Sequence, residues 1–79
     1  MLYAVFSHPH YGRESDSRLN NRVGLVKGCR YLVERVDVGG FMSYVYLVDF
    51  PNKMFNSVCF SFEDEYGNEV DIYNNPMYY

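Results

Sequence analysis

Two histidines lie two residues apart in the segment His8-Pro9-His10, a spacing that could supply half of a metal site. Zinc sites need three or four convergent ligands, most often Cys and His. The two cysteines, Cys29 and Cys59, form no Cys-x-x-Cys pair that would complete such a site. The histidines are therefore expected on the surface of a loop, and the sequence predicts no metal and no other cofactor.

The other residues with reactive side chains lack the partners that catalysis requires. A cysteine nucleophile needs a histidine base and a group that orients it, and the spacing of Cys29 and Cys59 indicates neither. The acidic residues of 63–65 are consecutive, so their carboxylates splay around a turn and do not face each other. We expect no catalytic residue and a protein that is not an enzyme.

The segment 7–22 is predicted to be a long loop, because it combines Pro, Gly, Ser and Asn with almost no large aliphatic side chain. Loops of more than about 12–15 residues in small domains are usually functional or mobile. Tyr and Arg are the residues that most often anchor protein interfaces, and the segment carries Tyr11, Arg13 and Arg18. We predict that these three bind a partner, with an ordinary solvated loop as the alternative.

Aromatic residues are in surplus, with nine Tyr, six Phe and no Trp among 79 residues. The interior of a small barrel has too few places for all of them, so several tyrosines must lie outside. On the expected strand 42–49, Tyr44 and Tyr46 share one outward face if Val45 and Leu47 point into the core. Tyr44 and Tyr46 are therefore predicted to extend the partner-binding surface; alternatively, their rings only cover the neighbouring strands.

The charge is −3 and unevenly distributed. Residues 1–35 carry six Lys and Arg against three acidic residues, whereas residues 36–79 carry one Lys against seven acidic residues. A net acidic protein is a poor general binder of phosphate backbones. Neither a signal peptide nor an apolar run of about 20 residues is present, which predicts a cytoplasmic protein with no membrane partner.

The apolar pattern predicts short strands. A β-bulge near Glu34-Arg35 would bring Val36 and Val38 back onto the inward face of Tyr31 and Val33, and Gly39-Gly40 is a hairpin signal. The expected strands cover 2–6, the stretch after the turn at Gly28 up to about 38, about 42–49, 58–62 and 69–73, with turns at 49–53 and 63–68. The expected core contains Tyr31, Val33, Val58, Phe60, Phe62 and Ile72.

No 11-residue window gives a helical stripe of apolar residues, so the fold class expected is all-β. Five short strands after a long first loop predict a small five-stranded SH3-like barrel over 1–74, followed by a C-terminal tail, 75–79. An OB-like barrel is the alternative, but it normally has a helix between its third and fourth strands. The segment 51–57 is too short to provide one.

The run Leu25-x-x-Gly28-x-x-Tyr31-x-Val33 resembles the second strand of SH3-like domains, with Leu2-Tyr3 and the long loop before it. It is also similar to short uncharacterised bacterial and phage proteins with SH3-like barrels. The resemblance covers residues 2–62. SH3 domains bind proline-rich ligands through a Trp that this chain lacks. The resemblance therefore does not imply a proline-rich ligand.

Two functions from different classes remain. The first is a non-enzymatic module that binds a larger protein; here the resemblance implies a phage or mobile-element accessory protein that inhibits a host defence complex. The second is a nucleic-acid-binding small β-barrel, with the basic residues of 13–30 on phosphates and tyrosines stacked on bases. Net acidity and the absence of a basic run favour the first.

Overall fold

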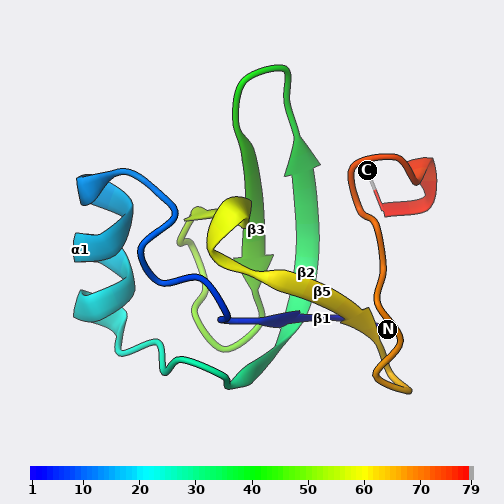
Figure 1. Ribbon diagram of the computed structural model, residues 1–79, viewed down its shortest axis with the longest axis horizontal. Helices are drawn as coiled ribbons and strands as arrows, with labels where there is room; N and C mark the ends of the chain where they lie inside the picture. Colours follow the sequence, from blue (N-terminus) through cyan, green and yellow to red (C-terminus); the bar gives the residue numbers. More distant parts are fainter. Residues whose placement is uncertain (79) are drawn as a thin grey trace.

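The computed structural model describes residues 1–78 and consists of one five-stranded antiparallel sheet with a short helix packed beside it (Figure 1). The strands lie in the order β4-β3-β2-β1-β5. Their bounds are β1 Leu2–Val5, β2 Arg30–Val38, β3 Ser43–Leu47, β4 Phe55–Asn56 and β5 Ser61–Asp64; the helices are α1 Glu14–Val23 and two 3-10 turns, η1 Ser57–Cys59 and η2 Pro76–Tyr78.

Strand β2 belongs to both halves of the sheet because its register changes in the middle. Its first residues pair with β1 and its later residues with β3, and the register shifts between Val33 and Arg35. This confirms the predicted bulge, which adds one residue to a strand and bends it. In Figure 1, β2 and β3 accordingly form a hairpin that runs across the direction of β1 and β5.

The β2–β3 hairpin turns through the four residues 39–42, which confirms the hairpin predicted from Gly39-Gly40. At Gly39 the chain passes so close to itself that an added Cβ would lie 2.5 Å from the carbonyl oxygen of Met42. A larger residue there would force the backbone apart. Phe41 at the tip is fully exposed.

The core lies on the concave side of the bent sheet. Val45, Leu47, Phe55 and Ile72 are completely buried. Of the predicted core, Phe60, Phe62 and Ile72 are buried, and Tyr31 and Val33 are partly buried against them. Val58 was predicted to point inward and is instead exposed, so that part of the prediction is wrong.

The reversal at Val58 has a local cause. The expected strand 58–62 begins only at Ser61, and η1, Ser57–Cys59, occupies the start of that range. A 3-10 turn repeats every three residues and not every two, so it changes which side chains face inward. As a result Cys59, expected on the outward face, is buried, while Phe60 and Phe62 keep their predicted positions.

The segment 7–22 is not the irregular loop that was predicted, because α1 occupies Glu14–Val23. The helix begins where the Asp16 carboxylate accepts a hydrogen bond from the backbone N–H of Arg13, at 2.8 Å. It ends at Gly24, whose left-handed conformation (φ 81°) is one that glycine adopts without strain. The expectation of a chain without helices is therefore wrong.

The C-terminal segment also differs from its prediction. Instead of a fifth strand at 69–73 there is a single bridge between Glu69 and Glu63, with Ile72 buried beyond it. The segment predicted as a tail contains η2, and Tyr78 packs against the core. Tyr79 lies outside the described residues.

The sheet does not close into the barrel that was predicted. Within residues 1–78, its outermost strands β4 and β5 pair only on their inner sides, with β3 and β1, apart from the single bridge of β5 to Glu69. The protein is thus mostly β, with one open, strongly bent sheet and one short helix.

Candidate functional site

The side chains that alternate with the core residues form a second surface, which we call the outer sheet face. Cross-strand partners share one side of a sheet, and the register pairs Tyr3 with Leu32 and Arg35 with Tyr46. The outer sheet face comprises Tyr3, Arg30, Leu32, Arg35, Asp37, Tyr44, Tyr46 and Glu63.

Two arginines of β2 stack on tyrosines of this face. The guanidinium carbon of Arg30 lies 3.7 Å from the centre of the Tyr3 ring, and that of Arg35 lies 3.9 Å from the centre of the Tyr46 ring. Such cation–π contacts contribute about 0.5–1 kcal/mol when exposed. Each stack also restricts the conformations of a long, flexible side chain.

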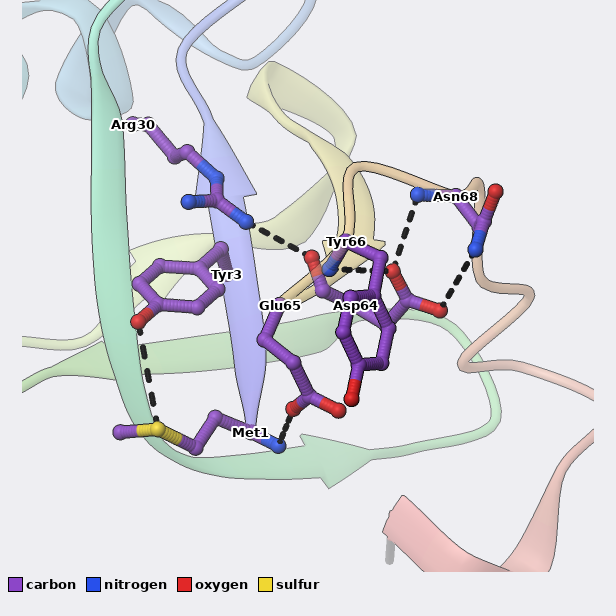
Figure 2. A network of polar contacts seen from close by, with 7 residues as sticks. All are labelled: Met1, Tyr3, Arg30, Asp64, Glu65, Tyr66 and Asn68. Atoms are coloured by element: carbon purple, nitrogen blue, oxygen red, sulfur yellow. Dashed lines mark hydrogen bonds and ion pairs between the residues drawn. The ribbon is translucent and has the colours of Figure 1, made fainter.

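The Arg30 stack is completed by acceptors from β5. Arg30 donates from Nε to the Glu63 carboxylate at 2.5 Å and from Nη2 to the backbone carbonyl of Asp64 at 2.7 Å. Figure 2 shows Arg30 beside the Tyr3 ring and its bond to Asp64, the last residue of β5. The guanidinium is therefore held by an aromatic ring, a carboxylate and a carbonyl of its own chain.

The turn that follows β5 is fixed by the Asp64 carboxylate (Figure 2). The Asp64 carboxylate accepts hydrogen bonds from the backbone N–H groups of Asn68 and Tyr66, both at 2.9 Å. These bonds, the Asn68 backbone bond above all, hold the pKa of Asp64 below its usual value. The N-terminal ammonium group forms an ion pair with Glu65, the residue after Asp64.

The Arg35 guanidinium stacks on a ring in the same way but has no acceptor from its own chain among the described residues. Within the described part of the chain, neither a hydrogen bond nor an ion pair reaches its guanidinium, and the residue is exposed. A guanidinium carries five N–H donors in a planar fork that matches a carboxylate. Arg35 thus presents a positioned cation with unused donors to the solvent.

Arg35 also borders a groove of about 380 Å³ beside the bulge. The exposed methionines Met1 and Met77 lie at this groove, and methionine adapts its shape readily to a bound side chain. The remaining lining residues are Leu2, Val33, Glu34, Val36 and Tyr78. The surface next to the cation therefore mixes apolar and polar atoms.

The structure places Tyr44 and Tyr46 together on the outer sheet face, half-buried, opposite the fully buried Val45 and Leu47. The sequence reasoning did not single out Arg35, the residue that covers Tyr46. A signal was present, because the predicted bulge at Glu34-Arg35 puts Arg35 opposite Tyr46 in the hairpin register.

The other predicted partner-binding residues lie at α1. Tyr11 is exposed and stacks on His8, with ring centres 4.3 Å apart. Arg13 precedes the helix and lies 3.5 Å from the Asp16 carboxylate, and Arg18 pairs with Glu14 at 3.1 Å. Among residues 1–78, no polar or ring contact joins them to Tyr44 or Tyr46, so the prediction covers two separate surfaces.

Buried polar groups fasten α1 to the sheet. The Asp16 carboxylate accepts from the side-chain amide of Asn56 at 3.0 Å. Burial alone would raise the pKa of Asp16, but the bonds from Asn56 and Arg13 and the charge of Arg13 outweigh it and lower the pKa from 3.8. The Asn20 amide donates to Cys59, whose thiol pKa is raised by burial.

Other kinds of site were sought in the described residues. Within 1–78, no group of three or more His, Cys, Asp or Glu side chains is placed to hold a metal ion. Cys29 and Cys59 are both free. The helices in this range include none with the length and apolar character needed to cross a membrane.

The fold and the outer sheet face define a small β-rich domain with a polar and aromatic surface on its solvent side. The whole chain, residues 1–79, matches the family model described as Bacteriophage T4 protein Y07B, and the chain belongs to this family of small phage proteins. No curated protein and no solved structure matched the chain.

Proposed function

We propose that the protein is a phage accessory protein that binds a larger protein through its outer sheet face and performs no catalysis itself. The observation that carries this proposal is the stack of Arg35 on Tyr46, an exposed cation held in place with its donors unused. Arg and Tyr are enriched among the residues that dominate binding energy at interfaces. Holding them in position before binding reduces the entropy lost on association.

Membership of a phage protein family supports the more specific role of inhibiting a host complex, such as a defence complex. A chain of 79 residues can act by covering a functional surface of something larger. Occupying such a surface is sufficient for inhibition.

The alternative, binding of nucleic acid, is favoured by the presence of Tyr and Arg on one sheet. However, the Tyr3 and Tyr46 rings already carry an arginine on one side, and Asp37 and Glu63 add negative charge to the same face. The net charge of −3 also opposes association with a polyanion. A protein partner is the better fit.

We also propose that the fold is a variant of the SH3-like class. Its support is the strand order, the bent β2 shared between two halves of the sheet, and the 3-10 turn before the last strand. A solved structure showing a different strand order would refute this assignment.

Photo-crosslinking in phage-infected cells tests the proposed function. A photoreactive phenylalanine replaces Tyr44 on the outer sheet face or, as a matched control, the exposed Tyr66 in the turn after β5. We expect position 44, and not position 66, to yield a single discrete protein adduct. Adducts that nuclease removes, or equal adducts at both positions, would contradict the proposal.

A further inference from the structure

The two arginine stacks form an internal comparison, because both lie on the same face and start from the same strand. Their ring distances differ by little, 3.7 Å at Tyr3 and 3.9 Å at Tyr46. At Arg30 the side-chain carboxylate of Glu63 accepts a hydrogen bond from Nε of the guanidinium. At Arg35 the corresponding carboxylate is missing among the described residues.

We propose that the partner supplies this missing group, so that Arg35 binds an Asp or Glu side chain of the partner. The inference rests on the proposed function, since it names the chemistry that the outer sheet face recognises. The Glu63–Arg30–Tyr3 arrangement shows that this backbone geometry accommodates a carboxylate in contact with a stacked arginine. Bonds between an arginine and a carboxylate combine charge with two-pronged geometry.

The surroundings of Arg35 favour a single carboxylate over a phosphate chain. Glu34 is its neighbour in the bulge, and Asp37 lies on the same face two residues further on. Binding along a nucleic-acid backbone needs several cations in a row, and here one cation is flanked by two anions. One charged side chain of a partner protein can contact Arg35 and avoid both.

The groove beside Arg35 adds a second requirement. Its walls include the inward-facing Val33 and Val36 together with Met77, so the groove opens on the core side of the bulge, and Arg35 is the residue that it shares with the outer sheet face. An apolar side chain that enters the groove would be removed from water there. A partner that contacts Arg35 and also enters the groove presents an acidic residue adjacent to an apolar residue. This pair is the smallest probe that carries the proposed chemistry.

The test uses two peptides that differ only in the charged group, acetyl-Glu-Phe-Leu-amide and acetyl-Gln-Phe-Leu-amide. Titrations at low salt follow the Nε–H signals of Arg35 and Arg30 by NMR in the full-length protein. We expect the Glu peptide to bind about two- to fivefold more tightly than the Gln peptide, the range for an exposed ion pair. The Arg35 signal should shift and the Arg30 signal should not.

Variants distinguish the outcomes. Arg35→Gln should abolish the preference for the Glu peptide, whereas Arg30→Gln, a change at the stack that is already complete, should retain it. Equal binding of the two peptides, or no shift at Arg35, would overturn the carboxylate inference without affecting a protein adduct at position 44. A shift of Arg35 that inorganic phosphate produces more readily than the Glu peptide would overturn it in favour of a phosphate ligand.

Discussion

Polar side chains gather in two regions of this domain, beneath α1 and on the outer sheet face, and the regions differ in where their hydrogen bonds go. Beneath α1, the buried Asp16 accepts from Arg13 and Asn56 and so attaches the helix to β4. On the outer sheet face, Arg35 keeps donors that no described residue uses. The first region therefore contributes to stability, and the second retains capacity for binding.

The largest expected effect on stability comes from disrupting the core against which both regions pack. Phe60 is buried and its ring lies 5.5–6.4 Å from those of Phe6, Phe55 and Phe62. Phe60→Ala should lower the free energy of unfolding by about 3–5 kcal/mol, enough to unfold most of the population of so small a domain. Circular dichroism and thermal melts measure this loss.

The fully exposed Phe41 provides the matched control for Phe60. Phe41→Ala removes the same atoms from the hairpin tip and should leave the melting temperature nearly unchanged. Similar losses for both variants would show that the aromatic core does not hold the fold in the way described.

The next effect is confined to the region beneath α1. Asn56→Ala removes the amide that donates to Asp16 and leaves a buried carboxylate short of one partner. We expect a loss of about 1–3 kcal/mol in urea unfolding. Asn68→Ala removes an exposed amide that also donates to an aspartate, Asp64, and should change stability far less. Equal losses would mean that burial does not distinguish the Asn56–Asp16 bond from the Asn68–Asp64 bond.

Acidification should weaken the region beneath α1 through Asp16. Its folded-state pKa is lowered, so its contribution is fully present above the ordinary pKa of 3.8 and disappears as pH falls through the lowered value. The melting temperature should therefore decrease as the pH falls below about 5 and through the lowered pKa. Asp64 and Asp71, whose pKa values are also lowered, should act in the same direction.

The variant Asp16→Asn isolates the part of this pH dependence that comes from Asp16. Asparagine keeps an oxygen that can accept from Arg13 and Asn56 but cannot titrate. The variant should be less stable than the wild type near pH 7 and should lose less stability on acidification. An identical pH dependence in the two proteins would exclude Asp16 as a source of the effect.

Much of the sheet could be predicted from the sequence because its strands alternate apolar and polar side chains. The bulge followed from the phase change between Val33 and Val36, and the hairpin from Gly39-Gly40. The helix α1 was missed because two of the residues it buries, Asp16 and Asn20, are polar, so apolar periodicity could not reveal it. Gly24 and the Glu14–Arg18 spacing were the available signals.

The outer sheet face was predicted only in part, for a different reason. Alternation on β3 placed Tyr44 and Tyr46 outward, which needs only local information. The stack of Arg35 on Tyr46 depends on the register between two strands, and the completion of Arg30 by Glu63 joins residues 33 positions apart. Such contacts follow from tertiary structure, which a strand pattern does not specify.

The smallest expected effects on stability are those of replacing the two stacked arginines. Arg30→Gln removes a cation–π contact, an ion pair with Glu63 and a bond to a carbonyl, and should destabilise the fold by about 1 kcal/mol. Arg35→Gln removes only the contact with Tyr46 and should cost about 0.5 kcal/mol or less. Paired urea titrations of the two variants measure the difference.

Arg30→Gln should have the larger effect on stability, whereas Arg35→Gln should have the larger effect on binding. Arg35→Gln should reduce the position-44 adduct formed in infected cells, because the variant lacks the charged guanidinium that faces the partner. Arg30→Gln should leave that adduct nearly intact, since Glu63 and Asp64 of its own chain already hold the Arg30 guanidinium through two bonds. If Arg30→Gln instead abolished the adduct and Arg35→Gln did not, the partner would contact the β1–β5 half of the sheet. The completed stack would then be part of the binding surface, and the separation between a stabilising and a binding arginine would be wrong.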